Sequence, residues 1–540
     1  MQKLLFTLLG GWVCLLPIFT SAQNAALRER CQSPVLFEKN ITILSVEWES
    51  ENNFAYCKLV GETERRVSEI DQQEYAIGFE MRLPDHWNQR FLFQGNGGND
   101  GRVVPATGAG ANHPVTALAQ GFAVISTNAG HQSQSLFGGA MFGFDPLARI
   151  NYGYRANQVL TPIAKTIVEK FYGNRPQHSY FVGCSNGGRH AMVAASRLSD
   201  EFDGFLAGNP GFNLPKAAVQ HAWDVQALSS LNTDLSRSLS QTTLDLLSAK
   251  VVAACDSLDG LQDGMVHALE ACQSVFKLDT LNCANEQTTQ CIDSKTTNVI
   301  AKLFAGPTNS AGETLYSNWI YDTGINAADW RRWKIQSPIA NLPMIATLGA
   351  SSLANIFTTP PTAVDANPTS LLTYLREFSF DRDAKKIYAT DERYGESAMA
   401  FMTPPQVEQL PGLVENGGKL MVYHGASDGV FSVADSINWY KQLNFNHNNK
   451  ADAFARLFLV PGMNHCAGGP ATDQFDLLSA LVAWVEEGIA PDAIVAAVNP
   501  ANTSIPDTWS KQRTRPLCSY PTIATYQSGN PEHAASFVCR

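Results

Sequence analysis

The chain has 540 residues, of which 44% are hydrophobic and 16% are charged. It is too long for one ordinary core and too apolar for a disordered chain, so we expect two lobes. Its 39 Lys and Arg against 50 Asp and Glu give a formal net charge of −11, and no basic run stands out, which argues against a nucleic-acid partner. Eleven cysteines favour an oxidising compartment, because cytosolic thiols stay reduced.

The start of the chain has the features of an export signal. Lys3 precedes an apolar run over residues 4–19, and residues 20–22 form a small-residue cleavage site. We therefore expect residues 1–22 to be a signal peptide and the mature protein to be periplasmic or extracellular, without a membrane span. The alternative, a membrane anchor, needs roughly 20 apolar residues, more than this run contains. Removal of the leader also removes Cys14 and leaves ten cysteines, an even number that suits complete pairing.

Short apolar segments alternate with helical stretches from residue 75 to about residue 210. This alternation is typical of an α/β sheet whose strands are buried on both faces. Four strands are expected there, at residues 75–83, 90–94, 122–127 and 179–183. A helix is expected over residues 157–171, where apolar residues recur at helical spacing, and it should lie against the sheet.

The middle of the chain, residues 212–405, has a different character. It is rich in Ser, Thr, Asn and Ala and ends in a Pro-rich stretch, so we expect an inserted lobe. Strand and helix patterns then resume, at residues 419–424, 456–460 and 477–486. We therefore predict that residues 23–211 and 406–540 form one domain and that residues 212–405 form a second.

The clearest chemical signal follows the fourth expected strand. The chain there reads Gly183-Cys184-Ser185-Asn186-Gly187, a form of the motif G-x-S-x-G, and continues into a segment of helical composition. A strand, a sharp turn and a helix in this order lift a serine hydroxyl out of the backbone at the carboxyl end of a sheet. A structural glycine-rich turn is the alternative for so short a match. A nucleophilic serine also requires a base and a carboxylate, so the presence of these partners distinguishes a catalytic turn from a structural one.

A serine hydroxyl needs a base to take its proton, and the base needs a carboxylate to orient it. Asp428 stands on the loop after the strand expected at 419–424, and His465 on the loop after the strand expected at 456–460. The order Ser185, Asp428, His465 is the one that α/β-hydrolases use. We therefore predict an α/β-hydrolase fold with a large inserted lid domain and a triad of these three residues.

Other histidines and acids near these strands fit supporting roles. His424 stands beside a strand end and His190 lies one turn into the helix after the serine, so we expect both to pack rather than to catalyse. Asp435, the nearest rival of Asp428, falls in what reads as the next helix.

The negative charge of an acyl-transfer transition state needs N–H donors as well. We expect one donor to be the backbone N–H of Asn186, directly after the nucleophile. The second is expected from the glycine-rich loop at residues 95–99, at Gly97. A tight turn without a role in binding is the alternative for this loop.

With these residues in place, the chain resembles the tannase and feruloyl esterase family, and the resemblance spans the mature chain. Its most specific mark is a cysteine pair, because Cys184 precedes the serine and Cys466 follows the histidine. In that family these cysteines are disulfide-bonded, which ties the nucleophile and base loops together. Proximity and the resemblance imply four further pairs: Cys31 with Cys57, Cys255 with Cys272, Cys283 with Cys291, and Cys518 with Cys539.

A second mark lies in the inserted lobe, where three aspartates stand within eight residues, among glycines that permit sharp turns. Such a segment can surround a hard cation with oxygen ligands. The family places a calcium ion here. The resemblance implies five ligands, namely the carboxylates of Asp256, Asp259 and Asp263 and the backbone carbonyls of Leu261 and Met265. The alternative is an acidic turn held by a disulfide; we expect a structural Ca²⁺ ion.

The inserted lobe should lie over the triad and supply specificity, because an insertion between Ser185 and Asp428 emerges at the carboxyl end of the sheet. Aromatic residues of the lobe can stack on a planar acyl group. The candidates are Trp319, Trp330, Trp333, Tyr374, Phe378 and Phe380. Arg376 is a candidate partner for a substrate carboxylate, with a surface salt bridge as the alternative.

These observations predict a secreted serine carboxylic-ester hydrolase that acts on small esters of aromatic acids, such as feruloyl or galloyl esters, through an acyl-enzyme. One alternative is a hydrolase of the mono(2-hydroxyethyl) terephthalate type. A secreted serine peptidase is another, because the same triad cleaves amides. A binding protein that keeps the scaffold without the chemistry is the third. The sequence does not specify an oligomeric state.

Overall fold

The computed structural model describes residues 16–33, 40–51, 53–109, 112–133, 139–283 and 290–540. The expected leader comprises residues 1–22, and residues 1–15 of it lie outside the described residues. Its last residues open helix α1 (Leu16–Cys31), which runs through the expected cleavage point. In the described part of the chain no helix is long and apolar enough to cross a membrane.

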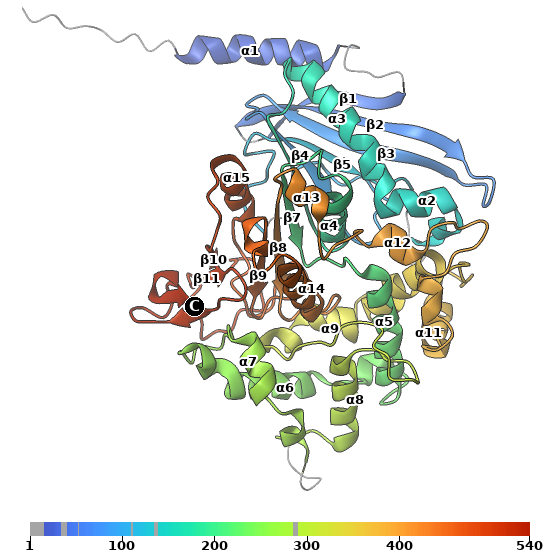
Figure 1. Ribbon diagram of the computed structural model, residues 1–540, viewed down its shortest axis with the longest axis vertical. Helices are drawn as coiled ribbons and strands as arrows, with labels where there is room; N and C mark the ends of the chain where they lie inside the picture. The colour runs from blue at the N-terminus through green and yellow to red at the C-terminus, as the bar shows by residue number, and fades with distance from the viewer. Residues whose placement is uncertain (1–15, 34–39, 52, 110–111, 134–138, 284–289) are drawn as a thin grey trace, which may run out of the picture.

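A nine-stranded sheet forms one half of the molecule (Figure 1), with the order β1-β2-β3-β5-β4-β6-β7-β8-β9. The strands are β1 (Ile41–Glu51), β2 (Phe54–Val67), β3 (Glu74–Pro84), β4 (Arg90–Gly95), β5 (Ala123–Thr127), β6 (His178–Cys184), β7 (Gly204–Gly208), β8 (Lys419–Gly425) and β9 (Ala455–Val460). Pairing is antiparallel from β1 to β5 and parallel from β5 to β9. All six strands expected from the sequence are confirmed within one residue at each end, whereas β1, β2 and β7 were not predicted.

Helices cover both faces of this sheet because alternate strand residues are buried on opposite sides. Phe181 packs in one hydrophobic cluster, whereas its neighbours Tyr180 and Val182 pack in another. The first cluster is covered by α3 (Ala156–Tyr172), α4 (Asn186–Arg197) and α14 (Val433–Asn446), and the second by α15 (Leu477–Glu487). The helices expected at 157–171 and 477–486 are thereby confirmed, and this is the α/β-hydrolase architecture that the sequence predicts.

The chain between β7 and β8 forms a helical lobe, coloured green to orange in Figure 1, and most of it lies below the sheet. Its helices are α5 (Leu214–Ser229), α6 (Gln241–Cys255), α7 (Leu269–Val275), α8 (Ser294–Ala305), α9 (Ala328–Lys334), α10 (Ala350–Ser352), α11 (Pro368–Glu377) and α12 (Ala398–Met402). α13 (Pro411–Glu415) follows the lobe, and its Leu413 packs in the first cluster of the sheet. The hydrophobic cluster that fills the lobe also takes in Phe142, Tyr152 and Phe431, from segments expected in the sheet domain. The two parts therefore share a core, and the boundaries at residues 212 and 405 stay a prediction.

Four short strands near the C-terminus form two antiparallel pairs that were not predicted. They are β10 (Ala493–Ala497) with β11 (Thr514–Cys518), and β12 (Ala524–Tyr526) with β13 (Phe537–Cys539). A bridge between Phe458 and Ser519 joins this segment to β9. Strands of three to five residues are too short for an alternating pattern to identify them.

Two glycines let α4 lie directly against the sheet. A Cβ atom on Gly183 would lie 2.5 Å from the backbone of Gly187, and one on Gly187 would lie 2.3 Å from the carbonyl oxygen of Gly95. Both separations are shorter than any tolerated contact, so only glycine permits this approach of helix to strands.

We predict that Gly183→Ala lowers the free energy of unfolding by about 1–3 kcal/mol or more, because the added methyl group overpacks this junction. Urea unfolding of the purified protein measures the effect. Gly395→Ala is the matched control, since a Cβ there has no neighbour within 4 Å. Equal unfolding midpoints for the two variants would contradict the prediction.

Candidate active site

The turn between β6 and α4 presents Ser185. This residue has φ of +65° and ψ of −127°, a conformation that a residue with a side chain rarely adopts. Its N–H donates to the carbonyl of Gly208 at the end of the neighbouring strand, at 2.9 Å. The strained turn lets the chain pass from strand to helix while the serine side chain projects from the carboxyl edge of the sheet.

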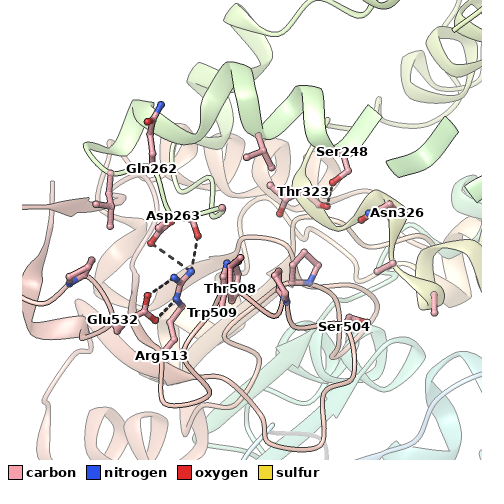
Figure 2. Close-up of a pocket in the computed structure, with 18 residues that line it drawn as sticks. Ser248, Gln262, Asp263, Thr323, Asn326, Ser504, Thr508, Trp509, Arg513 and Glu532 are labelled. Atoms are coloured by element: carbon pink, nitrogen blue, oxygen red, sulfur yellow. Dashed lines mark hydrogen bonds and ion pairs between the residues drawn. The ribbon is translucent and has the colours of Figure 1, made fainter. Parts of the chain in front are cut away.

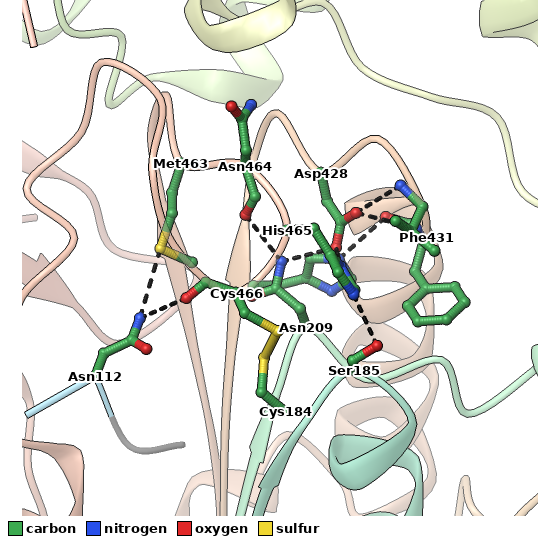
Figure 3. The surroundings of a disulfide bond; sticks show 12 residues. Asn112, Cys184, Ser185, Asn209, Asp428, Phe431, Met463, Asn464, His465 and Cys466 are labelled. Atoms are coloured by element: carbon green, nitrogen blue, oxygen red, sulfur yellow. Dashed lines mark hydrogen bonds and ion pairs between the residues drawn. A yellow bond between two sulfur atoms is a disulfide. The ribbon is translucent and has the colours of Figure 1, made fainter. Parts of the chain in front are cut away.

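His465 lies between this serine and Asp428 (Figure 3). Its Nε2 is 2.7 Å from Oγ of Ser185, and its Nδ1 is 2.9 Å from Oδ2 of Asp428. Asp428 follows β8 and His465 follows β9, so the ends of three parallel strands bring the predicted serine, base and acid together. This is the spacing that transfer of the serine proton to Nε2 requires.

The buried carboxylate of Asp428 is held by several donors. Oδ1 accepts from the N–H groups of Val430 and Phe431, and Oδ2 accepts from Nδ2 of Asn209 at 2.7 Å. Burial alone would raise the pKa of Asp428, but the adjoining His465 and His424 outweigh it and hold that pKa well below its ordinary value. The acid therefore stays ionised and keeps the imidazole proton on Nδ1, which leaves Nε2 free to accept.

The other side chains weighed from the sequence have supporting contacts, as predicted. His424 lies 3.3 Å from Oδ2 of Asp428 and contacts Ser436. His190 is buried in α4, beside Asn157. Asp435 lies in α14 and accepts hydrogen bonds from Asn213 and Ser317.

A disulfide between Cys184 and Cys466 joins the serine turn to the histidine loop (Figure 3), across 282 positions of sequence. The carbonyl of Cys466 accepts a hydrogen bond from Nδ2 of Asn112 at 2.7 Å. The structure contains four more disulfides, and they join the cysteines that the resemblance implies: Cys31–Cys57, Cys255–Cys272, Cys283–Cys291 and Cys518–Cys539.

The two expected N–H donors flank the serine. A Cβ atom on Gly97 would lie 3.9 Å from Cβ of Ser185, which places the glycine loop against the nucleophile. Asn186 is the first residue of α4, where backbone N–H groups have no partner within the helix. The role of both N–H groups as oxyanion donors stays a prediction.

Helix α9 of the lobe packs against the catalytic loops. Trp333 meets the ring of His465 edge-on, with ring centroids 5.3 Å apart, and Phe431 does so at 5.4 Å. A Cβ on Gly429 would lie 3.3 Å from both Trp330 and Trp333. Of the six aromatic candidates, these two tryptophans lie at the site. Phe431 was not predicted, although it stands only three residues after Asp428.

The remaining aromatic candidates and Arg376 lie elsewhere in the lobe. The ammonium group of Lys334 lies over the ring of Trp319. The ring of Phe378 packs against those of Tyr374 and Phe380. Arg376, on α11, donates to Oγ of Ser229, the last residue of α5, and to the carbonyl of Thr233 in the turn after it. Its role as a partner of a substrate carboxylate stays a prediction.

A buried lobe carboxylate that the sequence did not mark, Asp322, bridges the two catalytic loops. Its Oδ2 accepts from Oγ of Ser427 at 2.6 Å and from the N–H of Gly462 at 2.8 Å. Ser427 directly precedes Asp428, and Gly462 lies three residues before His465. No local pattern distinguishes this aspartate, because its partners are more than a hundred residues away.

The acidic segment of the lobe is close to the C-terminal strands. Asp256 accepts from the N–H of Gly264, and Asp259 accepts from those of Leu261 and His267. Burial, with neighbouring carboxylates, raises the pKa of Asp259 to about 7, and burial raises that of Asp256. A cation bound to this segment stays a prediction.

The third aspartate of this segment turns toward two arginines. Asp263 pairs with Arg515. It also lies 3.8 Å from Arg513, which pairs with Glu532, as Figure 2 shows. These residues, Arg515 apart, line a cavity of about 800 Å³ between the lobe and the C-terminal segment. Within the described ranges no three acidic, histidine or cysteine side chains converge as metal ligands do.

Comparison with known proteins agrees with this geometry. A family model described as tannase and feruloyl esterase matches residues 57–540. The mono(2-hydroxyethyl) terephthalate hydrolase of Piscinibacter sakaiensis is 38% identical over 519 residues, which cover 90% of this chain and 84% of that protein. A probable feruloyl esterase of Arthroderma benhamiae is 28% identical over 476 residues, which cover 85% and 81%.

The fold is shared as well. The crystal structure of feruloyl esterase B from Aspergillus oryzae superposes with a TM-score of 0.75 at 23% identity, over 95% of this chain and 100% of that one. The serine turn, the two parallel-strand loops and the paired cysteines thus lie on a scaffold that the family model covers almost throughout. The chain belongs to the tannase and feruloyl esterase family of carboxylic ester hydrolases.

Proposed function

We propose that this protein is an exported serine esterase that cleaves esters of aromatic acids, feruloyl or galloyl esters first among them. The observation that carries the proposal is the hydrogen-bonded series from Ser185 through His465 to Asp428. The five disulfides support maturation in an oxidising compartment, which suits a periplasmic or extracellular protein with a signal peptide.

The proposed mechanism is acyl transfer in two halves. His465 takes the proton of Ser185 as Oγ attacks the ester carbonyl, and the N–H groups of Gly97 and Asn186 bind the oxyanion. His465 then returns the proton to the departing alcohol, which leaves an acyl-enzyme. Water, deprotonated by His465, then attacks the acyl-enzyme, and the tetrahedral intermediate breaks down to the aromatic acid as His465 returns the proton to Oγ of Ser185.

The aromatic rings beside His465 support the proposal that the acyl group of the substrate is aromatic. Trp333 and Phe431 both lie against His465, so an acyl carbonyl at Ser185 would have planar apolar neighbours. A terephthalate monoester is the second candidate, favoured by the 38% identity to the hydrolase of that substrate. Its free carboxylate would need a cation, for which Arg376 remains the candidate.

Replacement of the nucleophile tests the proposal. We expect Ser185→Ala to reduce kcat by about 10⁵-fold or more, while the circular dichroism spectrum and the unfolding midpoint stay unchanged. The substrates are methyl ferulate, methyl gallate, mono(2-hydroxyethyl) terephthalate, a short-chain nitrophenyl ester and a peptide panel. Hydrolysis retained by the variant would refute the nucleophile, and a preference of the wild-type protein for peptides would favour the peptidase alternative.

We also propose that the disulfide between Cys184 and Cys466 positions the catalytic loops. The variant Cys184→Ala/Cys466→Ala should lose at least tenfold in kcat while fully folded, because small displacements of reacting groups reduce rates steeply. Activity per folded molecule is measured well below the melting temperature. Cys31→Ala/Cys57→Ala is the control, distant from the triad in sequence, and should lose stability with kcat retained. Equal losses of kcat would contradict a positioning role.

A structural calcium ion in the lobe is part of the proposal. The carboxylates of Asp256, Asp259 and Asp263 and the carbonyls of Leu261 and Met265 would hold it. The raised pKa values of Asp256 and Asp259 support a cation there, because buried carboxylates without one resist ionisation. The ion would compete with Arg515 for Asp263 and would brace the lobe against the C-terminal strands.

Chelation tests this site. Calcium at a hundredfold excess over its Kd should stabilise the chelated protein by about 2.7 kcal/mol, seen as a higher melting temperature, and elemental analysis should find the metal in the purified protein. Asp259→Ala should abolish both effects. Asp279→Ala, at an exposed aspartate of the same lobe, should leave them unchanged. A melting temperature insensitive to calcium would refute the ion.

A further inference from the structure

A cluster of buried polar side chains lies beside the loop that carries Gly97, and no step of the proposed reaction uses it. The side chains of Asp100 and His190 are each 1% exposed, and Nε2 of His190 lies 3.3 Å from Oδ2 of Asp100. Asp100 belongs to the loop after β4, and His190 belongs to α4. Burying such groups is unfavourable unless they are paired with other polar groups. Their pairing indicates that they hold neighbouring segments in place.

Asp100 contacts both sides of the oxyanion site. Its backbone N–H donates to the carbonyl of Gly97 at 3.2 Å, and this turn holds Asp100 at φ of +43°, which a residue with a side chain rarely adopts. Its Oδ1 accepts a hydrogen bond from Nδ2 of Asn186. One residue thus links the turn that presents Gly97 to the first residue of α4, the second donor.

Further hydrogen bonds connect the glycine loop and the start of α4 by a second path. Oδ1 of Asn186 accepts from Nε of Arg189 at 2.6 Å, and Arg189 donates to the carbonyl of Tyr152 at 3.0 Å. The hydroxyl of Tyr152 donates to the carbonyl of Gly98 at 3.3 Å. The path from Asp100 through Asn186, Arg189 and Tyr152 therefore returns to the glycine loop, so the loop and the helix end are held relative to each other.

His190 adds a polar contact to Asp100 without adding a charge. Burial lowers the pKa of His190, with Arg189 acting in the same direction, so the ring is neutral near pH 7. Its Nδ1 lies 3.0 Å from Nδ2 of Asn157, an amide that can only donate. Its Nε2 faces Oδ2 of Asp100 and also lies 3.1 Å from Nη2 of Arg189 and 3.3 Å from Nδ2 of Asn186, so the ring packs among the polar side chains of the cluster.

We propose that Asp100 is a positioning residue of the oxyanion hole, which fixes the backbone N–H groups of Gly97 and Asn186 relative to each other. The inference rests on the proposed function. Such donors act only if they are already in place where charge develops, and that charge exists in the transition state and not in the bound ester. Loss of the link should therefore lower kcat and leave KM nearly unchanged.

The test compares two substitutions of Asp100. Asp100→Ala removes the acceptor, and we expect kcat on a nitrophenyl ester to fall about 10- to 100-fold, less than the 10²–10³-fold that loss of an entire donor causes. KM should stay within about twofold. Asp100→Asn keeps an oxygen opposite Asn186 and should restore most of kcat. Rates are normalised to active serine by titration.

Two further variants separate positioning from general stability. Asp203→Ala removes a carboxylate that accepts from the N–H of Ser179 at 2.7 Å, near the opposite end of β6, and should reduce stability but not kcat. Asp100→Ala/Asn186→Ala should be no slower than the slower single variant, because both substitutions break one link. Fully additive losses would overturn the proposal.

A second readout does not depend on the ester chosen. A fluorophosphonate forms a bond to Oγ of Ser185 as fluoride leaves and His465 takes the proton, and the same N–H groups bind its phosphoryl oxygen. Slower labelling of Asp100→Ala, restored in Asp100→Asn, supports the proposal even if no tested ester is cleaved. Unchanged labelling and kcat in Asp100→Ala, or equal loss in both variants, would overturn it. A wild-type protein that is never labelled would overturn the proposed function as well.

Discussion

Parallel pairing of β6, β7, β8 and β9 is the constraint on which the site depends. Parallel strands end at the same edge of a sheet, and the turns after three of these strands carry Ser185, Asp428 and His465. Ser185 and His465 are 280 residues apart in the chain, yet their reacting atoms are 2.7 Å apart. A slip of one residue in this ladder would move a loop by about 3.3 Å, more than a hydrogen bond tolerates. Backbone hydrogen bonds remote from the substrate thus set the geometry of proton transfer.

The helical lobe contributes to this geometry as well as to the substrate side. Asp322 accepts from both loops that flank the triad, and α9 lays Trp333 against His465. Burial raises the pKa of Asp322 because a buried carboxylate is costly to ionise. The hydrogen bonds from Ser427 and Gly462 offset part of this free-energy cost. The lobe is therefore part of the support of the base and the acid, and a substitution in it can act on the chemical step.

Local patterns in the sequence predicted the elements that build the triad. The motif around Ser185 and the loops after two apolar strands each lie within a few residues, and burial on both faces makes such strands continuous apolar runs. β1 and β2 were not predicted because their residues are only partly buried and because β2 carries Glu62, Glu64 and Arg65 in its interior. β7 has only five residues, two of them glycine.

The polar contacts were beyond such patterns. Asp100 and Asn186, or Asp263 and Arg515, meet only once the chain has folded, and a single sequence carries no mark of these pairings. The predicted calcium ligands show what a local pattern can and cannot indicate. Their spacing is local and was visible, whereas the arginines that face Asp263 come from the end of the chain.

The core shared by the lobe and the sheet has a consequence for how substrate enters. Phe142, Tyr152 and Phe431 are packed in the same apolar cluster as the lobe helices, so swinging the lobe away as a rigid body would expose that cluster to water. Such exposure is unfavourable by roughly 25 cal/mol for each Å² of apolar surface. Ser185 is half-buried with the lobe in place, so access to it does not require the lobe to swing away from the sheet.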